Sequence, residues 1–254
     1  MDITKSLYYY KFKSLFPKSL YDKVLSIYFK FRASFYYGSS VVCPICGNRF
    51  KRFIGNKTYG NCPYCNSGSR HRAMFLFLIK RTNFFSEDLK VLHFAPEYCF
   101  FYLFRSMRNL NYISGDLDPI RAQENINMEN IHYPNDFFDV VISSHVLEHV
   151  NDDSKAIKEL YRVQNKSGFQ IHMVPIDSSL SKTYEDQTIT SPKLRKRIYG
   201  HFDHKRIYGV DFIDRLSKVG FSVTIYTPTD YLQQDEIMKY GVSLGEKIFY
   251  CKKV

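Results

Sequence analysis

The chain has 254 residues, which is enough for one large domain or for one domain with an appendage. Hydrophobic residues make up 44% of it and can supply a packed core, while a formal charge of +11 indicates an anionic partner: a nucleic acid, a membrane surface or a phosphorylated substrate. No apolar run approaches the roughly 20 residues of a membrane-spanning helix. No secretory signal is visible either, so we expect a cytoplasmic protein with reduced thiols.

Residues 1–40 are rich in aromatic and basic side chains. Apolar residues at spacings of three and four predict an amphipathic helix, and Pro17 is a suitable end for a helix before it. These apolar residues are Leu20, Val24, Ile27 and Phe31. Two interpretations stay open: a helical arm packed on the main domain, or a helix that binds a membrane surface or a partner.

Two C-x2-C pairs separated by fifteen residues form the clearest motif of the chain. Each pair can span one edge of a tetrahedron, and Gly47 and Asn66 let the backbone turn back towards the metal. We therefore predict a structural zinc ribbon over residues 41–69, because four thiolates leave no open coordination position. Two disulfides are the alternative, which a reducing compartment disfavours. The predicted ligands are Cys43, Cys46, Cys62 and Cys65.

A helix is predicted to begin at Ser69, which can cap it. Arg70 and Arg72 lie in its first turn. Two alternatives stay open for these guanidinium groups: they are solvated, or they face an anionic ligand.

Strands and helices alternate from residue 89 onward. This order predicts a Rossmann-like α/β fold, with a parallel sheet of seven strands and helices on both faces. We expect helices over 99–109, 152–164 and 210–218. The expected strands are 90–94, 111–115, 126–128, 138–143, 168–174, 221–226 and 247–251.

A dense group of imidazole and carboxylate side chains follows the fourth predicted strand. His145, Glu148 and His149 spell H-x-x-E-H, a zinc-protease pattern. That pattern needs both imidazoles on one long helix, and only about six residues separate the strand from the next helix start at Asp152. We therefore interpret the group as a ligand-binding loop at the carboxyl end of a strand, where open α/β sheets place their crevice.

Residues 89–254 resemble a class I S-adenosylmethionine-dependent methyltransferase with a methyltransferase-11-like domain. The resemblance lies in the order of the elements and in the segment FDVVISSHVLEHV at 138–150. The cysteine pairs followed by RHR, the segment VLHFAPE at 91–97 and YGHFDHKRIYG at 199–209 are similar to a subgroup associated with surface-glycan biosynthesis. The resemblance implies a methyltransferase domain over residues 70–254, with an acceptor-side insertion at 175–208.

The resemblance also implies where S-adenosylmethionine binds. Asp116, after the second strand, would accept hydrogen bonds from the ribose hydroxyls, and Asn127 would bind adenine in place of the more usual Asp. The loop after the first strand carries no glycine, unlike most of the superfamily, and Ala95 would approach the cofactor through its backbone. The implied cofactor-binding residues are His93, Ala95, Glu97, Asp116, Asn127, Met128, Ser144 and His145.

Methyl transfer to oxygen or nitrogen often requires a base, and imidazole is suited to that role near neutral pH. The candidates are His145, His149, His172 and His204. We favour His204, oriented by Asp203, within a segment that looks like an acceptor-side lid. The predicted catalytic residues are thus His204, Asp203 and His145, and the predicted acceptor-binding residues are His149, Arg206 and Tyr208.

The leading hypothesis is a methyltransferase acting on a hydroxyl of a glycan or another small anionic acceptor. One alternative is a nucleic-acid methyltransferase, which the positive charge and the zinc ribbon favour. The other is a non-catalytic zinc-containing binding module, which the missing glycines favour and which predicts a closed cofactor crevice. Peripheral membrane contact through residues 1–40 remains open, as does the oligomeric state.

Overall fold

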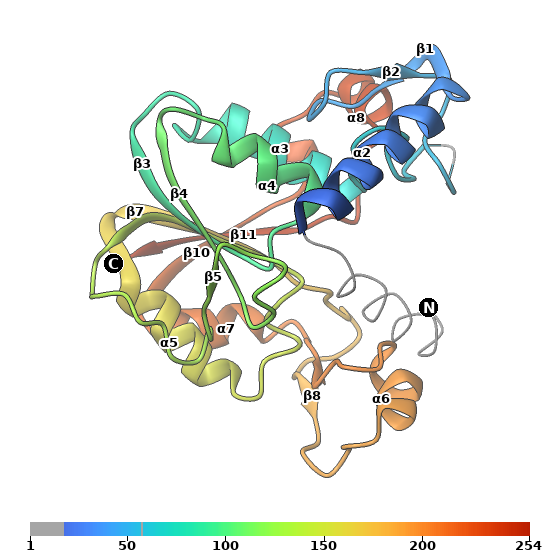
Figure 1. Cartoon of the computed structure of the whole chain (residues 1–254). Helices are drawn as coiled ribbons and strands as arrows, with labels where there is room; N and C mark the ends of the chain where they lie inside the picture. The colour runs from blue at the N-terminus through green and yellow to red at the C-terminus, as the bar shows by residue number, and fades with distance from the viewer. Residues whose placement is uncertain (1–17, 57) are drawn as a thin grey trace. The chain divides into compact units, whose positions relative to one another are not determined.

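The structure is a computed structural model that describes residues 18–56 and 58–254. The chain divides into two compact units (Figure 1). The first contains the chain up to Arg81 together with Pro228–Glu246, and the second contains Thr82–Thr227 and Lys247–Val254. The sequence predicted a domain boundary near residue 70. The first unit also includes the helix that begins at Ser69 and the segment Pro228–Glu246, both of which we had expected in the methyltransferase domain.

The first unit combines helices with a small two-stranded antiparallel sheet. The predicted amphipathic helix is confirmed as α2 (Lys18–Ser34), while Pro17 lies outside the described residues. Its four apolar residues are exposed, with Ile27 at 67%, whereas Phe29 is buried. The remaining elements are β1 (Tyr37–Val42), β2 (Arg49–Phe50), α3 (Ser69–Arg81), η1 (Pro228–Asp230) and α8 (Gln234–Tyr240).

Arg72 on α3 is neither solvated nor available to a ligand, which corrects both interpretations of this residue. Its side chain is fully buried, with the guanidinium 3.9 Å from the centroid of the Phe53 ring. It donates to backbone carbonyls of Ser67 (2.6 Å), Gly60 (3.0 Å), Tyr240 (2.7 Å) and Gly241 (2.7 Å). The residue therefore joins the cysteine-bearing segment to the late segment of the same unit.

The second unit is built on a seven-stranded sheet of order β10-β11-β7-β6-β3-β4-β5. The predicted number of strands is confirmed. The sheet consists of β3 (Leu89–Phe94), β4 (Leu110–Asp116), β5 (Glu124–Asn125), β6 (Phe138–Ser144), β7 (Gln164–Met173), β10 (Phe221–Tyr226) and β11 (Ile248–Lys253).

Two details of the sheet differ from the sequence prediction. Strand β11 is antiparallel to both neighbours, β7 and β10, so the sheet is mixed rather than parallel. The third strand covers Glu124–Asn125 and pairs with Gly115 and Asp116, earlier than the predicted 126–128. Ile126 instead packs its side chain over Gly115, where a Cβ atom would approach it to 2.9 Å.

Helices cover both faces of this sheet, as predicted. Helices α5 (Asp153–Val163) and α7 (Phe212–Ser217) pack on one face, where Leu160 and Leu216 join Leu92, Val141 and Phe249 in the main core. Helix α4 (Tyr98–Arg105) covers the other face, with Phe104 against His93 and Tyr112. Helix α5 begins as expected, because the Asp152 carboxylate accepts a hydrogen bond from the Lys155 amide at 3.0 Å.

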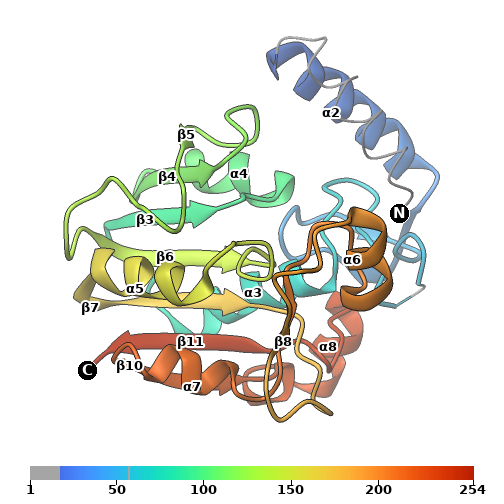
Figure 2. The same ribbon diagram turned by 90° about the horizontal axis from the view of Figure 1, so that it is seen from below.

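The predicted insertion lies beyond the carboxyl ends of the parallel strands. Figure 2 shows β8 (Tyr184–Glu185) and α6 (Pro192–Tyr199) at the end of the sheet towards which the arrows of β3, β6 and β7 point. Strand β9 (Arg206–Ile207) pairs with β8 and returns the chain to α7. Within the described part of the chain, no helix combines the length and apolar character needed to cross a membrane.

Candidate cofactor crevice and metal centres

A cavity of about 410 Å³ opens in the second unit at the carboxyl ends of β3, β4 and β6. Its size is in the range of small-molecule sites. Five of the predicted cofactor residues line it: Ala95, Asp116, Asn127, Met128 and His145. His149 and Asp203, predicted for the acceptor side, line the same cavity together with Arg195 and Lys205.

The loop after β3 takes a glycine-like backbone conformation without a glycine. Ala95 has a φ of 47°, in the left-handed region, where a side chain costs roughly 1–2 kcal/mol. Its amide donates to the Gly115 carbonyl at 2.8 Å, which fixes the loop to β4. The backbone thus reaches the cavity at the residue we predicted, with the strain held by the strand pairing around it.

His93 and Glu97 do not line the cavity. The His93 ring is fully buried, with Nδ1 3.0 Å from the Tyr112 hydroxyl and Nε2 3.2 Å from Glu97 Oε2. These two predicted cofactor residues therefore connect the buried end of β3 to the start of α4.

Asp116 ends β4 and faces the cavity. Its Oδ1 accepts a hydrogen bond from the Asp118 amide at 2.9 Å, and burial raises the pKa of its carboxyl group. Asn127 Oδ1 accepts from the Glu129 amide at 2.9 Å, which places Asn127 and Met128 in a tight turn beside the crevice. Both segments follow neighbouring strand ends, so their side chains meet at one edge of the sheet.

In the loop after β6, the two histidines of the H-x-x-E-H motif contact different carboxylates. His145 lines the cavity with a φ of 56°, and its Nδ1 lies 3.1 Å from Oε1 of the fully buried Glu148. His149 pairs instead with Asp203, its Nδ1 lying 3.1 Å from Oδ1. Ser144 is buried, does not line the cavity, and its hydroxyl has no hydrogen-bond partner among the described residues.

Three imidazoles and one carboxylate gather where the loop after β6 meets the insertion. The ring of His149 lies 4.7 Å from that of His204 and 5.8 Å from that of His201, measured between centroids. Asp203 Oδ1 contacts Nδ1 of both His149 and His201. Sequence reasoning missed His201, although three titratable side chains within four positions, 201–204, were a usable signal. His204, the predicted base, does not itself line the cavity.

Arg206 and Tyr208, which we predicted to bind an acceptor, are buried and do not line the cavity. The Arg206 side chain is 2% exposed and donates to the carbonyls of Leu147 (2.9 Å), Val150 (2.8 Å) and Asn151 (3.0 Å). The fully buried Tyr208 donates to a carboxylate oxygen of Asp153 at 3.0 Å.

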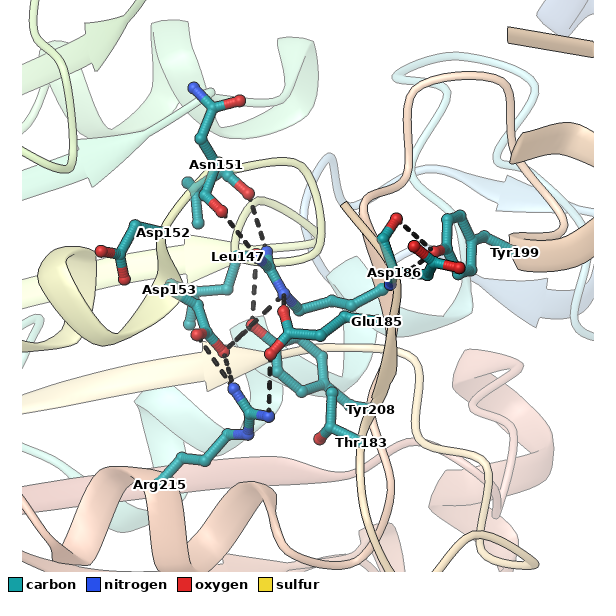
Figure 3. Close-up of polar contacts among 12 residues, drawn as sticks. Leu147, Asn151, Asp152, Asp153, Thr183, Glu185, Asp186, Tyr199, Tyr208 and Arg215 are labelled. Carbon is teal, nitrogen blue, oxygen red and sulfur yellow. Dashed lines mark hydrogen bonds and ion pairs between the residues drawn. The ribbon is translucent and has the colours of Figure 1, made fainter. Parts of the chain in front are cut away.

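The same network extends to the surface side of the insertion. Figure 3 shows Asp153, Glu185, Tyr208 and Arg215 pointing towards one another. Arg215 lies 2.9 Å from the Asp153 carboxylate and 3.2 Å from that of Glu185. Glu185 also pairs with Arg206 at 3.0 Å. These contacts hold the insertion against the loop after β6, so they shape the crevice without lining it.

His172, another candidate base, lies inside the sheet. Its ring is fully buried, with Nδ1 2.7 Å from the Ser143 hydroxyl and Nε2 2.9 Å from Gln170 Oε1. Burial lowers the pKa of His172 to about 3, so the ring is neutral in the folded protein. It does not line the cavity, and its role is to satisfy polar groups within the sheet.

The four predicted cysteine ligands converge in the first unit. The Sγ atoms of Cys43 and Cys65 are 3.6 Å apart, and those of Cys46 and Cys62 are 3.7 Å apart. A tetrahedral Zn–S4 site with bonds near 2.3 Å has edges of about 3.8 Å. Gly47 and Asn66 have φ values of 72° and 60°, as their predicted turns require. All cysteines are free thiols, so the group can hold a metal ion and the disulfide alternative is wrong.

Comparisons with known proteins agree with this architecture. Residues 114–171 match the family model described as a methyltransferase domain. No curated protein matches the sequence. Among solved structures, the [4+2]-cyclase SpnF is similar with a TM-score of 0.51 and 10% identity, covering 80% of this chain and 86% of its own. An S-adenosylmethionine-dependent methyltransferase from Mesorhizobium loti has a TM-score of 0.47 and 14% identity, covering 66% and 93%.

The second unit has the class I methyltransferase fold. Numbered along the chain, the strand order is 3-2-1-4-5-7-6, with the seventh strand antiparallel and inserted beside the fifth. The methyltransferase match runs from within β4 to within β7, so it includes β6 and the end of β4 but not β3. Because a cyclase has a similar fold, the fold alone does not determine the reaction, which depends on the residues of the site.

Proposed function

We propose that the second unit is an S-adenosylmethionine-dependent methyltransferase that methylates a hydroxyl of a glycan or glycan precursor. The observation that carries the cofactor part is the meeting of Ala95, Asp116, Asn127 and His145 around one cavity. The cofactor, when bound, supplies a methyl group on a positively charged sulfur. The open cavity supports an enzyme over a non-catalytic module, whose crevice would be closed.

Each part of the crevice suits a different part of the cofactor. The Asp116 carboxylate would accept hydrogen bonds from the two ribose hydroxyls. The turn at Asn127 and Met128 would bind adenine, with the amide oxygen and a polarisable apolar side chain. The left-handed backbone at Ala95 would leave room for the amino-acid end of the cofactor.

The acceptor would enter between the cofactor and the insertion. His149 and Asp203 line that side of the cavity, and Arg195 and Lys205 add two positive charges. Such a rim suits a polar, anionic acceptor such as a phosphorylated sugar. The work of these residues is to hold the acceptor oxygen in line with the methyl group and to exclude water.

Calorimetry with S-adenosylhomocysteine tests the cofactor part. We expect the wild-type chain to bind it and Asp116→Ala to weaken binding about 100-fold, because two hydrogen bonds to a charged group are lost. Asp118→Asn is the matched control: it retains the oxygen that accepts from the Ile120 amide and should bind as the wild type does. Absence of binding to the wild type would refute the proposal.

Methyl transfer from labelled cofactor to a panel of acceptors tests the acceptor part. Transfer to phosphorylated sugars is expected, and Lys205→Ala should raise the KM for an anionic acceptor while leaving S-adenosylhomocysteine affinity unchanged. Transfer to RNA with no transfer to saccharides would overturn the acceptor and leave the cofactor assignment standing.

A further inference from the structure

We propose that His149, His201, Asp203 and His204 form a second metal site, which binds a single divalent transition-metal ion of the zinc type. The four residues offer one ligand atom each, and all four atoms lie within 4.8 Å of one another. The group is separate from the four cysteines: it belongs to the sheet unit, and it has no sulfur ligand.

The donor set matches the chemistry of such an ion. Three imidazole nitrogens with one carboxylate oxygen suit zinc, whereas magnesium and calcium prefer oxygen ligands. With metal–ligand bonds of 2.0–2.1 Å, a tetrahedral site has edges of about 3.3 Å. The distance of 3.1 Å between His149 Nδ1 and Asp203 Oδ1 already fits one such edge. All ligand atoms lie within 4.8 Å of one another, so a bound ion would require the rings to turn until the remaining distances reach about 3.3 Å.

One imidazole already makes the second hydrogen bond that is typical of a metal-bound histidine. Nδ1 of His204 lies 3.2 Å from the backbone carbonyl of Tyr199. Because a carbonyl oxygen only accepts, the proton is on Nδ1 and the lone pair is on Nε2. Metal-bound histidines typically make this second hydrogen bond, which fixes the tautomer and the ring.

The scaffold around the four residues is built before any metal binds. The Lys205 amide donates to the Glu148 carbonyl at 2.8 Å, so the residues next to His204 and His149 are joined through their backbones. Arg206 adds its bonds to the carbonyls of Leu147 and Val150, on either side of His149. The two ligand-bearing segments, more than fifty residues apart in sequence, are therefore held in register by buried contacts, part of which Figure 3 shows.

The number of imidazoles also favours a metal over an acid–base pair. A carboxylate that orients a general base needs one imidazole as its partner. Here three rings surround one carboxylate, with all three centroid separations between 4.7 and 5.8 Å. Three neutral imidazoles and a carboxylate are a complete set of protein ligands for a mononuclear zinc ion.

The site opens onto the cavity through His149 and Asp203. An ion held there could expand from four to five ligands, with an acceptor oxygen as the fifth, and would then lower the pKa of that hydroxyl. This role in the reaction rests on the proposed methyl transfer, whereas metal binding stands on the side-chain geometry alone.

Metal analysis of the full chain tests the site directly. After zinc loading and removal of loosely bound ions, we expect two zinc ions per wild-type chain, one in each site. Cobalt substitution should give thiolate charge-transfer absorption from the cysteine site, and d–d bands without it from the second site. Because these measurements use the wild type, they do not depend on whether a variant folds. A single equivalent bound only through sulfur would overturn the proposal.

Variants then locate the second ion. His149→Ala and Asp203→Asn should each weaken zinc binding at the second site at least about 100-fold and leave the cysteine-bound ion in place. The matched control is His132→Asn, an exposed histidine paired with Glu124 at 3.2 Å, which should keep both ions. Retention of the second ion by both ligand variants would also overturn the proposal. Failure to bind S-adenosylhomocysteine together with binding of two zinc ions would refute the proposed function and leave this site standing.

Discussion

Replacing Arg206 by Met tests whether this residue acts through structure and not through acceptor binding. The side chains have similar length, but Met removes every donor. Three carbonyls, those of Leu147, Val150 and Asn151, lose a charged partner, and Glu185 loses a contact at 3.0 Å. Each charged hydrogen bond is worth about 1.5–3 kcal/mol, but the effects do not add fully because water reaches some of these groups. We expect a loss of about 3–5 kcal/mol in the free energy of unfolding, as for other broken buried ionic contacts.

Urea unfolding followed by far-ultraviolet circular dichroism measures this loss. The matched control is Arg197→Met, which removes an exposed guanidinium from α6 and should change stability by less than about 0.5 kcal/mol. Arg206→Lys should recover only part of the loss, because an ammonium group cannot reproduce the planar set of donors. If Arg206→Met and Arg197→Met unfold at the same urea concentration, the structural role of Arg206 is wrong.

Three further predictions concern stability and metal content. The pKa of His172 is about 3 in the folded protein and about 6.5 in the unfolded chain, so only the unfolded chain gains a proton on this ring as the pH falls below 6.5. The free energy of unfolding should therefore be highest above pH 6.5 and fall by about 2 kcal/mol between pH 6.5 and 5. In His172→Gln this additional fall should disappear, and an unchanged pH dependence in the variant would contradict the prediction. Arg72→Met should destabilise the first unit by about 3–5 kcal/mol in urea unfolding, whereas Arg70→Met, in the same turn of α3, should cost about 1 kcal/mol or less; equal losses would refute the buried role of Arg72. Cys65→Ser should lose one zinc ion by metal analysis, and full retention would rule out the cysteine site.

The sheet could be predicted from sequence because its signals are local. Apolar runs bounded by turn residues marked the strands, and the spacing of the cysteine pairs marked the metal-binding turns. Asp116 was implied by the resemblance to the methyltransferase family, and the structure places it at the end of β4 beside the crevice. The direction of β11 was not predictable from its own residues, because its short apolar pattern is compatible with both parallel and antiparallel neighbours.

The burial of two arginines could not be predicted from the sequence. Arg72 and Arg206 are buried, although a guanidinium in a polar segment suggests a ligand or solvent. Their partners are mostly backbone carbonyls, which every residue carries and which no sequence pattern distinguishes. Burial of a charge depends on distant segments meeting around it, and only the folded chain shows that meeting.

The sequence by itself determined that seven strands alternate with helices and that four cysteines are spaced to meet at one metal site, since both follow from patterns within short stretches. Only the tertiary structure decided that His149 lies beside His201, Asp203 and His204, whereas the neighbouring Glu148 contacts His145. The physical reason is that a site made from two segments exists only when both are fixed in space. Here the buried bonds of Arg206 and the backbone bond from Lys205 to Glu148 provide that fixation.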